Sequence, residues 1–469
     1  MVQFILNEKE IKTGLSPGLA LLDFIRYKQD LTGTKIGCRE GDCGACTILC
    51  GEIKNGELVY TSATSCLMPI GNAHGKHIVT IEGINLEKLN AVQQAFANEG
   101  ATQCGFCTPG FVVSLAGFCM SKKVPSYSSA IDSMNGNICR CTGYKSIQRA
   151  AALINDQMKM RNNAEPLQFA IEQKVIPGYF LEIKERLTSL SASSNGLVKQ
   201  SSAKYLGGGT DLYVQQHDTI VGEPIRFLYD DPALKGIYKN GNTCELGGSV
   251  TVTDIAESKI FQEHFSRLNE YIKLISSTQI RNMATVAGNF TNASPIGDLT
   301  IFFLALNASI QLTDGLKSRQ VQLRDFYKGY KSLDKNKTEY IDKIFFELPG
   351  TGDMFNFEKV CKRTWLDIAS VNTAIFLKFK ENEIISAGLS AGGVGPVPFF
   401  LTKSSEFLLN KIISAQLIHD LIEIVQSEIS PISDARGTES YKRLLLSQLI
   451  KAHFIKLFPG LPLEKVLYP

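Results

Sequence analysis

Hydrophobic and polar residues alternate in a strand-like pattern at the start of the chain. Val2–Leu6, the polar stretch Asn7–Glu10 and the apolar Ile11 predict a short β-hairpin. Ser16 and Pro17 then predict the start of a helix, with Ser16 as the N-cap and Pro17 at the first helical position. The buried face of that helix is expected to comprise Leu19, Leu22, Phe24 and Ile25.

Further along the chain, apolar residues recur at helical spacing. Leu89–Phe96 predicts one helix, Thr108 and Pro109 begin a second, and a third follows Ser146. The polar, proline-containing and serine-rich stretch that comes next predicts a connector that is ordered in part. The residues of this connector that favour burial are Tyr179, Phe180 and Leu181.

Beyond the connector, short β-like runs alternate with glycine-rich turns and helices. The last segment, roughly 403–469, predicts a small α/β unit that ends in an amphipathic helix around Leu444–Phe458. A chain of 469 residues is too long for one ordinary core, so we expect a multidomain α+β protein. The predicted segments are a strand-rich domain at 1–85, a helical domain at 86–160, a connector at 161–203, a domain of strands and helices at 204–400 and a C-terminal domain at 401–469.

Composition narrows the class of protein. Hydrophobic residues make up 44% and charged residues 20%, as in globular proteins, and a net charge of +3 gives no electrostatic argument for binding nucleic acid or an anionic membrane. No apolar run approaches the ~18 residues of a spanning helix, and the N-terminus is unlike a signal peptide. We therefore expect a cytoplasmic protein, in which its 12 cysteines would seldom form disulfides. Ten of them precede residue 142, a distribution that indicates metal binding.

The first group of cysteines has the spacing C-x4-C-x2-C followed by a distant fourth cysteine. This pattern is typical of plant-type ferredoxins, which hold a 2Fe-2S cluster. The expected ligands are Cys38, Cys43, Cys46 and Cys66. Unusual backbone angles that let N–H groups approach the sulfurs are expected at Gly37, Gly41 and Gly44. Zinc or buried free thiols are the alternatives, and zinc fits poorly because zinc motifs favour paired C-x2-4-C units. Cys50 is expected to lie in a strand, as a bystander.

The second group combines a C-x2-C and a C-x-C motif. Its members are Cys104, Cys107, Cys139 and Cys141. Taken alone, this spacing is also compatible with zinc. Each motif, however, directly precedes a predicted helix start, so two helix N-termini would point their free N–H groups at one anionic cluster. That arrangement favours a second iron–sulfur cluster. Cys119 fits neither spacing and is expected to pack inside a helix.

Two later segments carry features of a phosphate or nucleotide site. The first is a strand that runs into a glycine turn, Tyr205, Leu206, Gly207, Gly208, Gly209, Thr210, Asp211 and Leu212. Its open backbone N–H groups suit a pyrophosphate, although a plain tight turn is equally compatible. The pattern is not G-x-G-x-x-G, so we do not predict a Rossmann domain. The second, Gln279–Asp298, packs small and polar residues around Gly288, which is costly unless the polar groups meet a ligand.

The cysteine segments resemble a known family. Gln103–Gly110 together with Gly136–Tyr144 is similar to the second iron–sulfur domain of the xanthine oxidase family of molybdenum hydroxylases, and Gly37–Cys46 with Ser65–Leu67 to the first. The resemblance implies a ferredoxin-like β-grasp domain and a four-helix iron–sulfur domain. An α/β FAD-binding domain with a C-terminal α+β subdomain would follow.

The resemblance also assigns flavin contacts. It implies that the FAD phosphates are lined by Thr285, Val286, Ala287, Gly288 and Asn289. Asp298 would take a sugar or ribityl hydroxyl, and Lys359 falls at a flavin-contacting lysine. Ile275 falls where the family places an apolar or aromatic side chain on the isoalloxazine face. An ordinary core position is an equally good interpretation of Ile275.

The resemblance implies that the chain would be an oxidoreductase subunit of xanthine dehydrogenase type, in an enzyme that oxidises hypoxanthine and xanthine. Electrons would leave the substrate at a molybdenum cofactor in a large partner subunit, with Gln103 and Cys141 toward its pterin. They would then pass through two 2Fe-2S clusters to FAD and on to NAD⁺. The family suggests a heterotetramer of two small and two large chains. Because no segment is large enough for a molybdenum domain, we expect no hydroxylation by this chain alone. We assign no catalytic side chain, since this mechanism needs no nucleophile or general acid from the protein.

Three alternatives remain open from the residues alone. A sister hydroxylase could act on an aldehyde or an N-heterocycle, because substrate contacts would lie in the partner. A zinc-bound scaffold that assembles a molybdenum subunit predicts colourless protein. A self-contained reductase of the NAD(P)H–ferredoxin type predicts a stable monomer without a partner.

Overall fold

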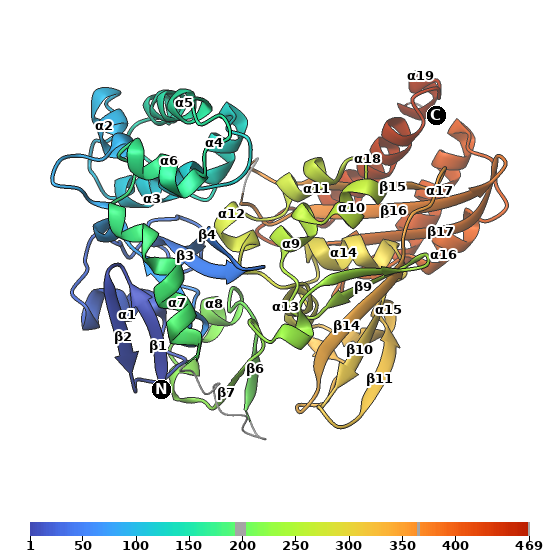
Figure 1. Ribbon diagram of the computed structural model, residues 1–469. Coiled ribbons are helices and arrows are strands. Elements are labelled where there is room, and N and C mark those ends of the chain that lie inside the picture. The colour runs from blue at the N-terminus through green and yellow to red at the C-terminus, as the bar shows by residue number, and fades with distance from the viewer. Residues whose placement is uncertain (193–202, 364–365, 468–469) are drawn as a thin grey trace. The chain divides into compact units, whose positions relative to one another are not determined.

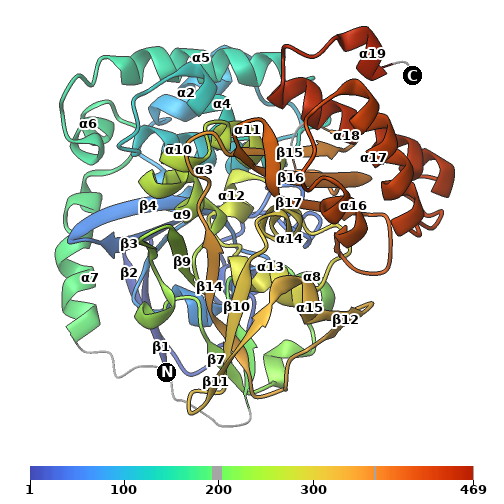
Figure 2. The same cartoon turned by 90° about the vertical axis from the view of Figure 1, so that its right-hand side faces the viewer.

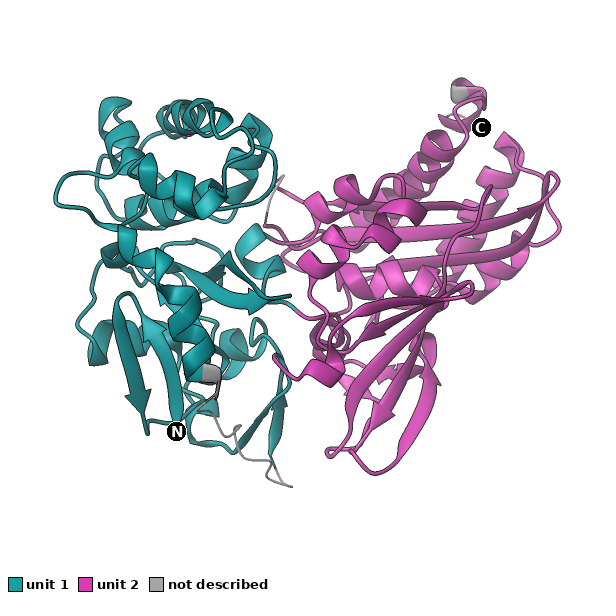
Figure 3. Cartoon of the chain, viewed as in Figure 1, with its two compact units in different colours: residues 1–229, 277–284 teal, residues 230–276, 285–469 magenta. Residues whose placement is uncertain are grey.

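The computed structural model describes residues 1–192, 203–363 and 366–467. The chain divides into two compact units, coloured separately in Figure 3. Unit 1 comprises Met1–Tyr229 and Ser277–Ala284, and unit 2 comprises Asp230–Ser276 and Thr285–Pro469. The chain therefore passes three times between the units. The five segments predicted above are a finer division, and their boundaries stay a prediction.

Unit 1 contains a mixed five-stranded sheet in the order β2-β1-β5-β3-β4, in which only β1 and β5 are parallel. Its strands are β1 (Val2–Leu6), β2 (Lys9–Thr13), β3 (Thr47–Lys54), β4 (Glu57–Thr64) and β5 (His77–Val79). The predicted hairpin is confirmed as β1 and β2. Helix α1 (Leu21–Lys28) buries Leu22, Phe24 and Ile25 in the same core as Phe4 of the sheet. This is the sheet-and-helix arrangement expected of a ferredoxin-like domain.

The predicted start of that helix is wrong. Helix α1 begins at Leu21 with Ala20 as the N-cap, so Ser16 caps nothing. The Ser16 hydroxyl instead donates to the carbonyl of Val221, with an oxygen–oxygen distance of 2.5 Å. Ser16 also accepts the Leu19 N–H in a turn. The Ser16 side chain, which the local pattern predicted as a helix cap, thus makes a long-range hydrogen bond instead.

The helical part of unit 1 lies at the top of the unit in Figure 1. Its helices are α2 (Ala91–Asn98), α3 (Thr108–Cys119), α4 (Tyr127–Ser133) and α5 (Lys145–Lys159). The three helices predicted from the residues are confirmed, and α4 is a fourth helix, which only the resemblance to a four-helix domain implied. Phe96, Phe111, Leu115 and Ile147 share one apolar core, which explains why the helices fold together. Cys119 is buried in α3, as expected.

The predicted connector contains two helices, α6 (Pro166–Glu172) and α7 (Ile183–Ala192). Phe180 is fully buried in the helical core and Tyr179 packs against it. Leu181, by contrast, is 51% exposed, so its predicted burial is wrong. The part of the connector at 193–202 lies outside the described residues. Unit 1 ends with a parallel strand pair, β6 (Lys204–Leu206) and β7 (Ile225–Phe227), around the short helix α8 (Leu212–Gln216).

Unit 2 is built on two larger sheets. The first has the order β11-β10-β14-β9-β8 and the second the order β15-β16-β17-β18. Their strands are β8 (Ile237–Asn240), β9 (Thr243–Gly247), β10 (Ser309–Thr313), β11 (Ser318–Gln322), β14 (Tyr340–Glu347), β15 (Met354–Val360), β16 (Val371–Lys380), β17 (Glu383–Gly392) and β18 (Phe399–Phe400). Strands β12 (Tyr327–Gly329) and β13 (Ser332–Leu333) form a small separate pair.

Helices cover these sheets, as Figure 2 shows. The short helices of unit 2 near β10 in the sequence are α9 (Val252–Glu257), α10 (Lys259–His264), α11 (Leu268–Leu274), α13 (Val286–Asn292), α14 (Asp298–Ala305) and α15 (Leu323–Phe326). Helix α12 (Thr278–Arg281) belongs to unit 1. Every residue of α14 from Leu299 to Ala305 is buried, because the helix packs on β16 and β17 with apolar residues all round.

The C-terminal segment differs from its prediction. After Phe400 the described residues form the helices α16 (Thr402–Phe407), α17 (Ala415–Glu428), α18 (Glu439–Leu457) and α19 (Leu463–Leu467). The predicted α/β unit is therefore wrong for this segment, since the strands of the subdomain precede it as β15–β18. The predicted helix is confirmed as α18, which buries Leu446, Ile450 and Phe454 in the core with β16, but its buried face also includes the polar Lys442 and His453.

The α+β multidomain class predicted from the sequence is confirmed. In the described part of the chain, no helix combines the length and apolarity needed to cross a membrane.

Candidate iron–sulfur and flavin sites

The first cysteine group lies on a tightly curled loop of unit 1. The Cys38 N–H donates to the Cys43 sulfur at 3.4 Å, and the Glu40 N–H donates to the Cys38 sulfur at 3.3 Å. Gly44 has a φ of +65°, and a Cβ there would lie 2.4 Å from the carbonyl oxygen of Gly136. The loop thus needs glycine both for its curl and for its close approach to the second cysteine segment.

The thiols of this loop meet in two pairs. The Cys43 thiol hydrogen-bonds Cys38 and lowers the pKa of Cys38 to about 5, while the same contact raises the pKa of Cys43. The contact between Cys46 and Cys66 lowers the pKa of Cys46 and raises that of Cys66. A 2Fe-2S cluster is bound by four thiolates, two on each iron, so two adjacent thiol pairs match this ligand set.

The second cysteine group repeats this pairing. The Cys104 and Cys141 sulfurs are 3.4 Å apart, and the thiols of Cys107 and Cys139 are hydrogen-bonded. Cys139 accepts from the Thr142 N–H at 3.5 Å. Burial acts to raise the pKa of Cys139, but hydrogen bonds from the Thr142 hydroxyl and backbone lower it overall.

Helix starts adjoin this second group, as the sequence predicted. Helix α3 begins at Thr108 with Cys107 as its N-cap, and α5 begins at Lys145, four residues after Cys141. Free N–H groups at both N-termini favour an anionic cluster. Among the described residues, no three His, Cys, Asp or Glu side chains surround a single metal position. Two thiol pairs are the ligand set of a two-iron cluster, in which each iron takes two thiolates.

The remaining cysteines lie apart from these pairs. Cys50 is buried in strand β3, as predicted, and Cys244 is buried in strand β9. Cys361 is partly exposed, and its thiol donates to the carbonyl of Arg363 at 3.1 Å. The buried histidines also have packing roles, since His77 bonds the Tyr60 hydroxyl at 2.7 Å and the Asn7 carbonyl at 2.9 Å.

The segment from Tyr205 to Leu212 lies in unit 1, between β6 and α8. A Cβ on Gly208 would lie 1.8 Å from the Met283 carbonyl oxygen, and a Cβ on Gly209, whose φ is +91°, would lie 2.6 Å from that of Leu67. The Gly207 carbonyl accepts from the Asn72 side chain at 3.0 Å. Close packing against neighbouring backbone therefore requires glycine at positions 208 and 209, whether or not a ligand binds there.

The other predicted flavin residues lie in unit 2. Thr285 is the N-cap of α13 and accepts the Gly288 N–H at 3.1 Å. The Asn289 side chain accepts from both the N–H and the hydroxyl of Thr300, each at 3.1 Å. Val286 is buried, while Ala287 and Gly288 are partly exposed. This segment forms a short polar helix start rather than a core element, as its composition suggested.

Three of the predicted residues form one cluster in unit 2. The Lys359 ammonium lies 2.7 Å from Asp298 Oδ2 and also donates to the Leu274 carbonyl at 2.7 Å. Ile275, which follows that carbonyl, is buried. The other Asp298 oxygen accepts from Asn372 at 2.6 Å. The structure thus brings Ile275, Asp298 and Lys359 to one place.

Asn372 was missed by the sequence analysis. Asn372 is fully buried within the largely apolar strand β16. A polar residue in an apolar run is the sequence feature that could have indicated a buried hydrogen-bonding role. The Asn372 Oδ1 atom has no hydrogen-bond partner among the described residues, and a Cβ on Gly392 would lie 2.2 Å from it. This oxygen therefore packs against the Gly392 backbone, while the Asn372 amide holds the partly exposed Asp298 carboxylate, the group that the resemblance assigns to a flavin hydroxyl.

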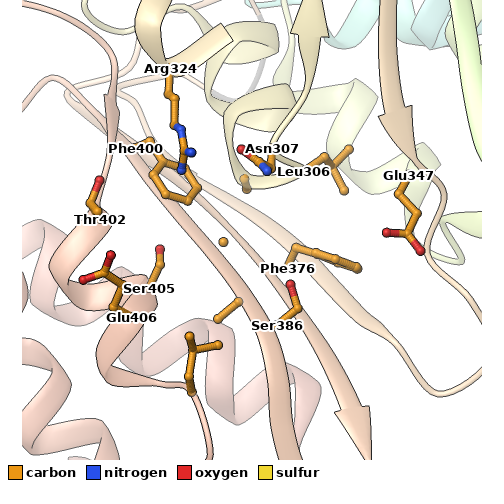
Figure 4. Close-up of a pocket in the computed structure, with 14 residues that line it drawn as sticks. Leu306, Asn307, Arg324, Glu347, Phe376, Ser386, Phe400, Thr402, Ser405 and Glu406 are labelled. Atoms are coloured by element: carbon orange, nitrogen blue, oxygen red, sulfur yellow. The ribbon is translucent and has the colours of Figure 1, made fainter. Parts of the chain in front are cut away.

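A separate cavity of unit 2, shown in Figure 4, contains none of these residues. It has a volume of about 250 Å³, and Arg324 lies over the Phe400 ring at its edge, 5.3 Å from the ring centroid. Ligand pockets usually occupy about 300–1,000 Å³, so we assign no site to it.

Comparison with protein families assigns a domain to each of these regions. Residues 4–70 match the 2Fe-2S iron-sulfur cluster binding domain, and residues 80–152 match the [2Fe-2S] binding domain. Residues 184–349 match the FAD binding domain in molybdopterin dehydrogenase. Residues 357–457 match the CO dehydrogenase flavoprotein C-terminal domain.

Individual relatives agree with these matches. Xanthine dehydrogenase 1 of Arabidopsis thaliana is 28% identical over 94% of this chain and 39% of its own length. The xanthine dehydrogenase/oxidase of Rattus norvegicus is 26% identical over 96% of this chain and 38% of its own length. This chain thus spans about two fifths of the curated relatives it matches.

Solved structures share the fold over about half of the chain. A CO dehydrogenase chain from Oligotropha carboxidovorans aligns with a TM-score of 0.51 and 23% identity, over 55% of this chain and 90% of its own. A chain of quinoline 2-oxidoreductase from Pseudomonas putida 86 aligns with a TM-score of 0.51 and 19% identity, over 57% of this chain and 92% of its own.

Proposed function

We propose that this chain, which carries the iron–sulfur and FAD-binding domains of the molybdenum hydroxylase family, is the electron-transfer subunit of a xanthine dehydrogenase. It receives electrons from a molybdenum centre in a large partner subunit, passes them to FAD and delivers them to NAD⁺. We further propose a cytoplasmic heterotetramer of two small and two large chains. The names of its curated relatives support the xanthine assignment.

The single observation that carries this proposal is the paired arrangement of two cysteine groups in one unit. The two ligand loops touch, because the Ile138 N–H donates to the Cys43 carbonyl at 3.0 Å. Cys43 belongs to the first group, and Ile138 directly precedes Cys139 of the second. Adjacent ligand loops are what a relay between two clusters requires.

The residues of this chain position the redox groups rather than carry out bond chemistry. When bound, the clusters carry single electrons and FAD exchanges one or two, which links one-electron steps to NAD⁺. Four thiolates would hold each cluster, and the backbone N–H groups of Glu40 and Thr142, which donate to Cys38 and Cys139, would stabilise the charge on those sulfurs. Asp298, held in place by Lys359 and Asn372, would accept a hydrogen bond from the flavin sugar or ribityl chain.

A sister hydroxylase acting on an aldehyde or an N-heterocycle is the second candidate, because the partner subunit would choose the substrate. Purifying the complex and assaying it with xanthine, an aldehyde and an N-heterocycle separates the two. Turnover of xanthine with NAD⁺ reduction is expected. Turnover of another substrate class alone would replace the xanthine assignment while leaving the relay intact.

The first experiment on the chain itself is a visible absorption spectrum, with iron, zinc and flavin assayed on the same sample. We expect about four irons per chain, as two 2Fe-2S clusters require, together with one FAD. Addition of NADH should bleach the flavin absorption. Colourless protein with zinc and no flavin, from cells able to build iron–sulfur clusters, would favour the scaffold hypothesis instead.

A further inference from the structure

A buried amide side chain connects the two cysteine loops of unit 1. Asn137 lies two residues before Cys139 and is 5% exposed. Its Nδ2 atom donates to the carbonyl of Gly44 at 3.0 Å and approaches the hydroxyl of Thr47 at 3.3 Å. Gly44 lies between Cys43 and Cys46 in the sequence. The Asn137 side chain of the second cysteine loop is therefore hydrogen-bonded to the backbone of the first.

Two further buried side chains orient that amide. Gln279 and Ser114 both donate to Asn137 Oδ1, at 3.0 Å and 2.8 Å respectively. Gln279 also donates to the Ser114 hydroxyl at 3.1 Å. Because Asn137 Oδ1 receives two donors, its Nδ2 is fixed in the direction of Gly44. The chain thereby uses α3, the second cysteine loop and helix α12 to hold one amide in place.

The network is tightly packed and costly to bury. Gln279 is fully buried, and its Oε1 atom has no hydrogen-bond partner among the described residues. A Cβ on Gly136 would lie 2.1 Å from that atom. An apolar side chain would fill this space without the desolvation cost of three polar groups. The bonds that Asn137 makes to Gly44, Ser114 and Gln279 instead hold the two loops in one arrangement.

We propose that Asn137, held by Ser114 and Gln279, is a positioning residue that fixes the spacing and relative orientation of the two iron–sulfur clusters. This inference rests on the proposed function and adds a role for residues that bind neither cluster. Electron tunnelling falls steeply with distance, so a loop that drifts away from its neighbour slows transfer between the clusters. The Asn137 amide binds the loop backbone at Gly44, next to Cys43 and two residues before Cys46.

The test uses Asn137→Leu, which keeps the volume but removes both hydrogen-bonding ends. The matched control is Asn155→Leu, since Asn155 is also buried in unit 1 but lies on α5, where its side-chain amide donates to the neighbouring Asp156 at 3.3 Å. In the fully reduced protein, electron paramagnetic resonance at low temperature reports the magnetic splitting between the clusters. We expect the splitting to weaken or broaden in Asn137→Leu and to stay unchanged in Asn155→Leu.

Gln279→Met provides a second variant that leaves both ligand loops intact. It should load four irons and still alter the splitting, because Asn137 loses one of its two fixing donors. Splitting and cluster potentials equal to wild type in an iron-replete Asn137→Leu or Gln279→Met protein would overturn the positioning role. A wild-type chain without either cluster would instead overturn the proposed function, so the two failures are distinguishable.

Discussion

The Lys359 ammonium and the Asp298 carboxylate form a buried ion pair, 2.7 Å from Nζ to Oδ2, in which the lysine side chain is 1% exposed. The sequence assigned these residues two separate contacts with a flavin. The structure shows that they are also each other's partners, at the start of α14 and the end of β15. A group that binds there meets a carboxylate whose charge is already compensated.

Breaking this pair should destabilise unit 2. Lys359→Met leaves the largely buried Asp298 carboxylate, 15% exposed, without its counter-ion, and losses of this kind cost about 3–5 kcal/mol in a buried pair. Urea unfolding of the purified chain measures this loss, and the flavin content of the same sample should fall with it. Lys378→Met is the control, because Lys378 pairs with Glu347 at 2.7 Å on the surface, where such a pair is worth about 0–1 kcal/mol. Equal loss in both variants would contradict the buried-pair interpretation.

Removing one cysteine of the second group should remove one cluster only. Cys104→Ser breaks the pair with Cys141, so the chain should keep about two irons, the content of one 2Fe-2S cluster, and its FAD. Electron paramagnetic resonance of the reduced protein should then show one iron–sulfur signal in place of two. The control Cys361→Ser changes a thiol outside both groups and should keep both signals. Two intact signals in Cys104→Ser would refute the ligand assignment.

The cysteine pattern was accessible from sequence because its ligands lie in short loops, where spacing alone constrains geometry. The hairpin β1–β2 and the helices α2, α3 and α5 were also accessible, because the local spacing of apolar residues defines them. The start of α1 was not accessible, since the Ser16 hydroxyl bonds Val221, 205 positions away. The role of Asn372 was hidden for the same reason, because its partner Asp298 lies 74 positions earlier. Local periodicity predicts an element, whereas a long-range hydrogen bond decides its ends and its buried polar groups.

The glycine turn of unit 1 gives a steric prediction. Gly208→Ala places a methyl group 1.8 Å from the Met283 carbonyl oxygen, so the backbone must move. Overpacking of this kind costs about 1–3 kcal/mol, and urea unfolding should report it. Gly222→Ala is the matched control in the same unit, because no atom lies within 4 Å of the added carbon. If Gly208→Ala were as stable as Gly222→Ala, the turn would not pack as described.

Acid should destabilise the protein through a buried histidine of unit 2. His453 is fully buried on α18, where the Asn356 amide donates to its Nδ1 at 2.8 Å and Nε2 faces the Thr373 hydroxyl at 3.4 Å. Burial lowers the pKa of His453 to about 3, and the nearby Lys456 ammonium acts in the same direction. The neutral ring is therefore the form that the folded chain holds.

The sign of the effect follows from proton uptake. An unfolded histidine has a pKa of about 6.5, so between roughly pH 6.5 and 3 the unfolded chain binds a proton that the folded chain excludes. His453 thus lowers the free energy of unfolding by up to about 1.4 kcal/mol for each pH unit of acidification in this window. His453→Gln should flatten the fall in stability between pH 6 and 4.5, measured by urea unfolding and compared with wild type. His419→Gln, at a partly exposed position, should leave the slope unchanged. An unchanged slope in His453→Gln would mean that the ring titrates in the folded chain as it does in water.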